Sequence, residues 1–289
     1  MRVESELRWI TWSLDEGVAT VVLNRPDRGN AWTGRMEAEY RIVLDAAEQS
    51  DRVGAIVITG AGKHFCVGAD AAAVSGISER GEYSSGLRAP FVEPGDPEHP
   101  AHGARHGFLL SLTKPVIAAI NGSAAGIGFA IACFCDVRFI AEKARLTTAT
   151  APLGLPAEFG VSWILPRLIG VSRAMPLLLG SPKITGAEAE ALGLAHRALP
   201  AADVVSAAQQ YARQLVTTAA PSSMASAKAQ VWLDMQRSLA EADRDADARL
   251  KQMVRSADFA VGARALSQRS RPDFAAKYRR PSISGANDA

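Results

Sequence analysis

The sequence has no uninterrupted apolar run of about twenty residues, so we expect no transmembrane helix. Neither charge sign dominates: 32 Lys and Arg against 30 Asp and Glu give a net charge of +2 over 289 residues. This balance does not indicate the concentrated basic surface of nucleic-acid-binding proteins. The first residues carry Arg2, Glu4, Glu6 and Arg8, which do not fit a signal peptide. We therefore expect a soluble, cytoplasmic protein that binds neither membranes nor nucleic acids.

Cysteine is also scarce, with three residues that all lie in apolar segments: Cys66, Cys133 and Cys135. Cys133 and Cys135 lack a second pair that would complete a metal site, so buried structural thiols are expected. Three histidines between residues 99 and 106 have helical spacing, but prolines and a glycine interrupt them. We expect a polar loop there and no metal site.

The order of apolar runs indicates an α/β core. Runs rich in β-branched residues predict strands over Arg8–Leu14, Val18–Leu23, Gly54–Thr59 and Val137–Ala141. Thr33 is expected to cap a helix that extends to about Gln49. The long polar segment Ser75–Arg105 is rich in Gly and Pro, which is typical of a functional loop or lid. From residue 201 the chain is Ala-rich and predicted to be helical, with Pro221 opening one helix.

The segment Lys114–Gly128 combines an apolar strand, a glycine turn and an apolar helix. Such a turn exposes N–H groups at a helix N-terminus, where an anion is favoured. One interpretation is the dinucleotide turn of an NAD(P)-dependent short-chain dehydrogenase. However, this turn comes late in the chain, and no tyrosine is followed four residues later by the lysine that those enzymes need.

A second interpretation uses two glycine turns together. Gly68-Ala69 follows one strand and Gly126–Gly128 follows another. Two N–H groups from adjacent turns can converge on one oxygen and stabilise a thioester enolate. The sequence therefore also predicts an oxyanion hole, for which the side chains in the two turns are irrelevant.

Several segments carry further motifs in order: Leu23–Pro26 with Asn30-Ala31, Gly62–Asp70, Lys114–Gly128, Cys135–Phe139, Leu165–Gly170, Ile184–Ala189 with Gly193-Leu194, and Arg271–Phe274. Together they resemble the crotonase, or enoyl-CoA hydratase/isomerase, superfamily. The resemblance implies an α/β fold, a spiral of ββα units, with a helical C-terminal region. Residues 1–200 would form the spiral core with the acyl-CoA site, and residues 201–289 the helical region used for trimerisation.

The resemblance also implies an enzyme of fatty acid metabolism, a lyase or isomerase that acts on an acyl-CoA thioester. No cofactor would be bound permanently, because coenzyme A is part of the substrate. The expected assembly is a homotrimer or a dimer of trimers. The N–H groups of Ala69 and Ile127 would form the oxyanion hole, although Ile127 occupies a position that is usually glycine. Coenzyme A contacts would come from Arg25, Arg28, Lys63, His64 and Val67, with ordinary surface charge as the alternative for the three basic residues.

The pattern departs from a hydratase at two positions. Ala130 and Thr150 stand where the family's hydratases carry glutamates, and neither can exchange protons in that role. Glu158 matches the catalytic aspartate of dienoyl-CoA isomerases and chlorobenzoyl-CoA dehalogenases, with helix capping as the alternative. Asp70 is expected to tie down its turn, and Trp163 to line the acyl pocket or to pack in the core. We favour isomerase-like proton transfer over hydration; a non-catalytic acyl-CoA-binding protein is the other alternative.

Overall fold

The computed structural model describes residues 7–278, apart from 71–74, 77–78, 80, 82–85 and 87–90, and also residues 283–284. Most of the predicted loop Ser75–Arg105 that precedes residue 91 therefore lies outside the described residues. From residue 91 to 106 the chain forms turns and bends without a regular helix, as its prolines and glycines predict.

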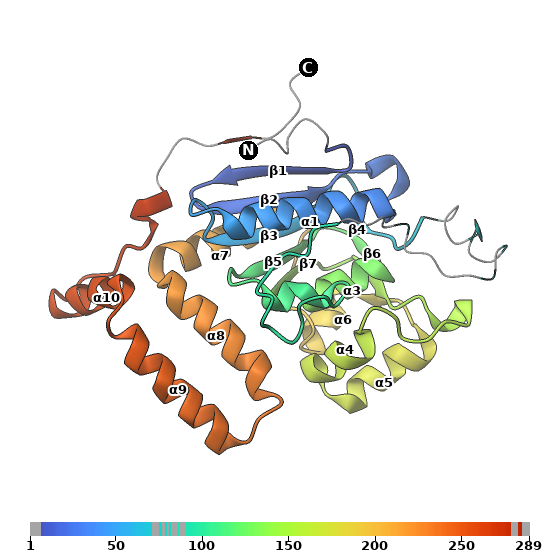
Figure 1. Cartoon of the computed structure of the whole chain (residues 1–289). Coiled ribbons are helices and arrows are strands. Elements are labelled where there is room, and N and C mark those ends of the chain that lie inside the picture. The colour runs from blue at the N-terminus through green and yellow to red at the C-terminus, as the bar shows by residue number, and fades with distance from the viewer. Residues whose placement is uncertain are drawn as a thin grey trace.

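The larger sheet has seven strands among the described residues, in the order β10-β7-β5-β3-β2-β1-β11 (Figure 1). Its strands are Ile10–Asp15 (β1), Val18–Leu23 (β2), Ala55–Gly60 (β3), Val116–Ile120 (β5), Val137–Ala141 (β7), Arg197–Leu199 (β10) and Ile283–Ser284 (β11). β1 and β2 form an antiparallel hairpin, and Glu16 and Gly17 at its turn have the positive φ of a type I′ turn. β2, β3, β5, β7 and β10 run parallel.

The smaller sheet has the order β4-β6-β8-β9 within the described chain. Its strands are His64–Cys66 (β4), Ser123–Ala125 (β6), Arg145–Thr147 (β8) and Ile184–Thr185 (β9). The successive pairs β3–β4, β5–β6 and β7–β8 each give one strand to each sheet, so the chain winds as a spiral. The predicted α/β spiral of ββα units is confirmed.

Helices cover the sheets as the apolar periodicity predicts. α1 spans Gly34–Gln49, and its N-cap Thr33 accepts a hydrogen bond from the Met36 N–H at 3.2 Å. α3 spans Ile127–Phe134 and is buried on all sides, since every residue in it is apolar or glycine. The other helices before residue 200 are Val161–Ile169 (α4), Val171–Gly180 (α5) and Gly186–Ala191 (α6), with short 3-10 turns at Pro26–Arg28 (η2), Gly107–Ser111 (η3) and Ala151–Leu153 (η4).

The C-terminal part is helical, as predicted: α7 is Val204–Thr218, α8 Pro221–Asp234, α9 Leu239–Met253 and α10 Ala257–Ser267, followed by a 3-10 turn at Ala275–Tyr278 (η5). Pro221 opens α8. α7 packs against the larger sheet and α8 against η3, whereas α9 and α10 extend away from both sheets (Figure 1). No helix in the described ranges is both long and apolar enough to span a bilayer.

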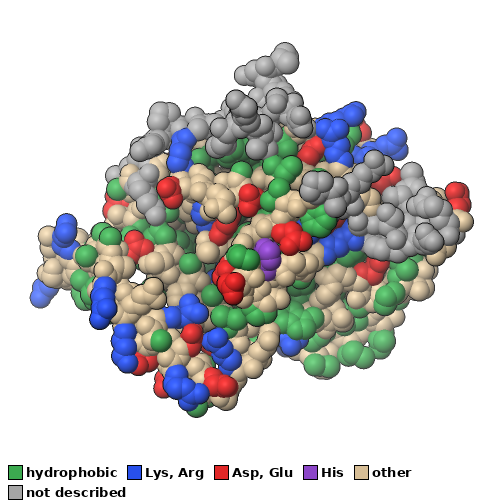
Figure 2. All heavy atoms as spheres, viewed as in Figure 1, with side chains coloured by type: hydrophobic (Ala, Val, Ile, Leu, Met, Phe, Trp, Pro, Cys, Tyr) green, Lys and Arg blue, Asp and Glu red, His purple; other side chains and the backbone are tan. Residues whose placement is uncertain are grey.

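The surface differs between the two ends of the molecule (Figure 2). Basic and acidic side chains intermingle over α9, where Arg249 pairs with Asp245 at 2.6 Å. Hydrophobic side chains gather over α4 and α5 at the other end, including the exposed stripe of Val171, Met175 and Leu179 on α5. On the face shown, positive charge is therefore interspersed with negative charge.

Candidate active site

Two glycine turns lie side by side where the parallel strands β4 and β6 end. Gly68 has φ +107 and Gly126 has φ +51, conformations that residues with a side chain rarely adopt. A Cβ atom on Gly68 would lie 3.3 Å from the Ala125 carbonyl oxygen, and one on Gly126 would lie 3.8 Å from the Gly68 Cα. The two backbones are therefore in contact, which brings the next residues, Ala69 and Ile127, close together.

The backbone N–H groups of Ala69 and Ile127 donate no hydrogen bond to any residue that the structure describes. The preceding N–H of Gly126, by contrast, donates to the Thr147 carbonyl at 3.2 Å. Ile127 is the first residue of α3, where N–H groups lack partners inside the helix and the helix dipole is positive. The positive φ of this turn falls on Gly126, so the β-branched Ile127 keeps an ordinary backbone conformation. These two donors are available to an anionic oxygen.

The two positions that the resemblance assigns to hydratase glutamates hold no carboxylate. Ala130 lies on α3 and is fully buried, and Thr150 is buried directly before η4. A methyl group and a neutral hydroxyl group cannot take up and release a proton at neutral pH in this role. Hydration by a pair of carboxylates therefore has no support at these positions.

Glu158 lies between η4 and α4 with its side chain partly buried. α4 begins after its N-cap residue Gly160, and the Glu158 carbonyl, rather than its carboxylate, accepts a hydrogen bond from the Val161 N–H at 3.0 Å. Burial raises the pKa of Glu158, although the positive charge of Arg105 opposes the shift. The chain turns directly after it, because Phe159 and Gly160 have φ +56 and +74. A carboxyl group with a raised pKa is suited to accept and return a proton.

A buried ion cluster that the sequence interpretation missed lies beside this turn. Glu37 on α1 accepts a hydrogen bond from Arg105 at 2.9 Å and pairs with Arg41 at 3.4 Å. Arg41 also donates to the Arg105 carbonyl at 2.7 Å, and the Arg105 guanidinium lies 5.1 Å from the centre of the Phe159 ring. The signal available in the sequence was the i, i+4 spacing of Glu37 and Arg41 on one helix, because Glu37 and Arg105 are 68 residues apart.

His106 is buried between two aromatic rings, 5.8 Å from that of Trp32 and 5.4 Å from that of Phe159. Burial lowers the pKa of His106 to about 3, although the Glu37 carboxylate opposes the shift, so the imidazole is neutral at neutral pH. Within the described ranges, no group of three or more His, Cys, Asp or Glu side chains is arranged to hold a metal ion.

The three cysteines, Cys66, Cys133 and Cys135, are buried free thiols. Burial raises the pKa of each thiol to about 12, so all three stay protonated at neutral pH. The prediction of structural thiols is confirmed.

The residues expected to contact coenzyme A share one surface, held together by the buried Asn30. Its Oδ1 accepts from the Arg25 N–H at 2.8 Å, and its Nδ2 donates to the His64 carbonyl at 2.8 Å. The turn Arg25–Arg28 therefore lies beside the segment Lys63–Val67. On this surface Arg28, Lys63 and Val67 are exposed and His64 is half-buried.

Arg25 differs from the other basic residues of this surface because its guanidinium is already engaged. It pairs with Asp70 at 3.1 Å and donates to the Ala31 carbonyl at 2.6 Å. Asp70 therefore links its own turn to Arg25, in keeping with the structural role expected of it. Arg28 and Lys63 remain the basic side chains of this surface that are open to a phosphate.

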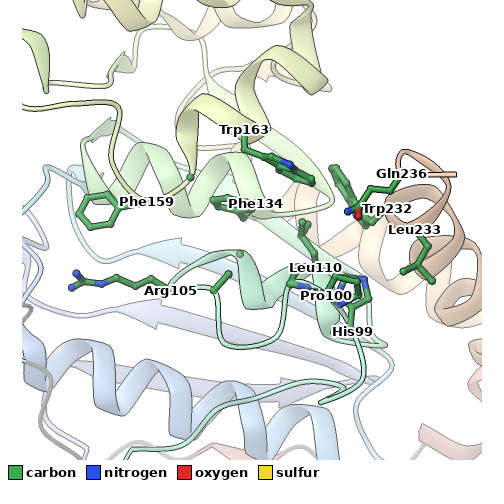
Figure 3. A pocket seen from close by; sticks show the side chains of 14 residues that line it. His99, Pro100, Arg105, Leu110, Phe134, Phe159, Trp163, Trp232, Leu233 and Gln236 are labelled. Carbon is green, nitrogen blue, oxygen red and sulfur yellow. Dashed lines mark hydrogen bonds between the residues drawn. The ribbon is translucent and has the colours of Figure 1, made fainter.

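A cavity of about 360 Å³ opens between α4, η3 and α8 (Figure 3). Phe159 and Gly160, which directly follow Glu158, lie in its wall. Trp163 also lines it, so this side chain faces a pocket, one of the two roles that the sequence allowed. The cavity therefore begins at the turn that carries Glu158.

A family model described as enoyl-CoA hydratase/isomerase matches residues 13–277. The chain is 32% identical over 211 residues to a 1,2-epoxyphenylacetyl-CoA isomerase of Escherichia coli strain K12, covering 73% of this chain and 77% of that protein. It is 32% identical over 266 residues to a probable enoyl-CoA hydratase of Rhodobacter capsulatus, covering 92% and 97%. A solved structure of a probable enoyl-CoA hydratase/isomerase from Mycobacterium abscessus aligns with a TM-score of 0.78 at 30% identity, covering 92% and 98%.

Proposed function

The chain belongs to the enoyl-CoA hydratase/isomerase family, and we propose that within this family it isomerises acyl-CoA thioesters rather than hydrating them. It is an acyl-CoA-processing enzyme of the hydratase/isomerase type, and the dehydrogenase alternative is thereby set aside. The observation that carries the proposal is the pair of N–H groups of Ala69 and Ile127, which lie in adjoining turns and donate to no residue that the structure describes. Glu158, together with the lack of a carboxylate at positions 130 and 150, supports isomerisation over hydration.

In the proposed reaction the thioester carbonyl oxygen accepts hydrogen bonds from the Ala69 and Ile127 N–H groups. The α C–H bond of a β,γ-unsaturated acyl group then breaks, and its proton passes to the Glu158 carboxylate. The electron pair delocalises onto the thioester oxygen, where the two donors and the positive end of α3 stabilise the developing charge. The Glu158 carboxyl returns a proton to the γ carbon as the α,β double bond forms. No water is consumed.

Coenzyme A enters as part of the substrate, and no permanently bound cofactor is needed for this chemistry. We place its phosphates on the surface that exposes Arg28 and Lys63, with His64 and Val67 beside them. Arg25 would support this surface through Asp70 rather than reach the phosphates.

The helical region 201–289 is proposed to join subunits into a homotrimer or a dimer of trimers around the 1–200 core. In support, α9 and α10 extend from the core and expose large apolar side chains: Leu239, Leu250, Phe259 and Leu266. A cytoplasmic location and a place in fatty acid metabolism stay predictions from the sequence.

The proposal is tested by product identity. A β,γ-unsaturated acyl-CoA incubated with the enzyme should give the α,β-unsaturated isomer of unchanged mass, identified by chromatography and mass spectrometry. An α,β-unsaturated acyl-CoA should not gain the mass of water. Accumulation of a hydroxyacyl-CoA as the main product would overturn the proposal.

The proposed proton transfer also predicts a pH effect of Arg105. Its charge opposes the burial that raises the pKa of Glu158, so Arg105→Gln should raise that pKa further. Because Glu158 must be ionised to accept a proton, activity falls as pH drops through its pKa. The acid limb of the kcat profile should therefore move to higher pH in Arg105→Gln.

Arg105→Lys keeps the positive charge and serves as the control, with an acid limb near that of the wild type. Thermal unfolding of both variants shows whether loss of the contact between Arg105 and Glu37 lowers the stability of the fold, which is separate from the change in the pKa of Glu158. An acid limb that stays in place, or moves to lower pH, in Arg105→Gln would show that Glu158 is not the titrating base.

A further inference from the structure

The cavity next to Glu158 has an unusual wall. Four aromatic side chains from separate segments face it: Phe134 at the end of α3, Phe159, Trp163 on α4 and Trp232 on α8 (Figure 3). The Trp163 and Trp232 rings lie 6.0 Å apart between centres with an interplanar angle of 36°. α8 thus closes one side of the cavity with a tryptophan that is 9% exposed.

Apart from the two tryptophans, the polar side chains among the lining residues lie at the two ends of this wall. Arg105 stands at the Phe159 end, where Glu37 holds its guanidinium, and His99 and Gln236 lie toward the Trp232 end (Figure 3). Between the two ends the cavity offers mainly aromatic and aliphatic surface, with the indole N–H groups of Trp163 and Trp232 as the side-chain hydrogen-bond donors. Such a surface binds an apolar group and penalises a polar one.

The length of α3 gives the distance between the proposed oxyanion hole and the cavity. Ile127 opens α3 and Phe134 is its last residue. At about 1.5 Å of rise per residue, the cavity end of α3 lies ~10 Å from the oxyanion hole. Glu158 lies along the same side, because Phe159 and Gly160 are cavity wall. An acyl group of only a few carbons would not span this distance and would leave the cavity empty.

The volume and the wall together favour a ring over a thin chain. A cavity of roughly 150 Å³ lined by apolar side chains is enough to hold benzene, and this one measures about 360 Å³. Aromatic faces and edges bind other rings through offset and edge-to-face contacts, beyond the burial of area alone. We propose that this cavity takes the remote, ring-bearing end of a bulky apolar acyl group, which makes ring-bearing acyl-CoA thioesters the substrate class of the enzyme. This inference rests on the proposed isomerase function.

The test compares kcat/KM for two β,γ-unsaturated acyl-CoA thioesters, one short and linear and one that carries a phenyl group at its far end. The wild type should prefer the phenyl-bearing substrate by more than tenfold. Trp163→Leu and Trp232→Leu keep apolar bulk and remove the ring, so each should lower this preference about three- to tenfold, mainly through KM. Phenylalanine at either position should restore most of the preference.

Trp12→Leu is the matched control, because Trp12 lies on β1 outside the cavity lining. The substrate preference of this variant should equal that of the wild type. Equal or better use of the short substrate by the wild type, or an unchanged preference in both cavity variants, would overturn the cavity proposal and leave the isomerase function intact. Failure of the wild type to isomerise either thioester would instead contradict the proposed function itself.

Discussion

The Ile127→Pro variant is expected to lose about 10²- to 10³-fold in kcat, the usual effect of removing one oxyanion-hole donor. Proline replaces the hydrogen of the Ile127 N–H with the Cδ methylene of its ring and leaves the other backbone groups in place. Ile127 is the first residue of α3, where proline is tolerated because that N–H has no partner within the helix. The preceding residue is Gly126, which has no Cβ atom to collide with the proline ring.

Ile127→Val is the control for this variant, since it keeps the N–H and the β-branched shape. It should keep kcat near the wild-type value and lower stability by only about 0.5–1.5 kcal/mol, because the side chain is buried. Both variants are first checked by thermal unfolding and circular dichroism. A folded Ile127→Pro enzyme with wild-type kcat would show that this N–H does not hold the reacting oxygen.

Glu158→Gln is expected to lower kcat by about 10²- to 10⁴-fold, the range that a positioned general acid or base contributes. The amide has the shape of the carboxyl group but cannot accept and return a proton. Binding should persist, so the Kd for an acyl-CoA thioester measured by calorimetry should stay within about threefold of the wild type, less than the tenfold that 1.4 kcal/mol represents.

Glu190→Gln makes the same chemical change on the exposed surface of α6 and should leave kcat unchanged. Retained binding with lost turnover identifies Glu158 as the acid/base of an enzyme. Full activity in Glu158→Gln would show that Glu158 is not the acid/base and has a structural role instead. A wild type that binds acyl-CoA without turning over any thioester would instead favour the non-catalytic binding protein.

Local features of the fold could be predicted because they depend on neighbouring residues. Thr33 as a cap, Val18–Leu23 as a strand and Pro221 as the start of a helix each follow from a few positions of sequence. The two glycine turns were also predictable, since glycine at a strand end signals a positive φ. The sequence did not show which residue of the second turn has the positive φ. In the structure it is Gly126 and not Ile127.

Contacts between distant segments could not be read from the chain. The pair Glu37–Arg105 joins α1 to an irregular segment whose path no periodicity specifies. The contact between Trp163 and Trp232 could not be predicted either, because it depends on how α8 packs on the core. Arg105 influences the pKa of Glu158 and the two tryptophans line the cavity, so both features required the structure.

In the proposed mechanism Glu158 removes an α proton from a thioester held by the Ala69 and Ile127 N–H groups. Isotope labelling tests this step directly. A β,γ-unsaturated acyl-CoA deuterated at the α carbon is converted by the enzyme, and the position of the deuterium in the product is determined by NMR. The proposed mechanism predicts that one α deuterium leaves that carbon as the α,β isomer forms, and that both Glu158→Gln and Ile127→Pro slow this loss. Product that keeps all of its α deuterium, or loss that proceeds at the wild-type rate in Glu158→Gln, would contradict it.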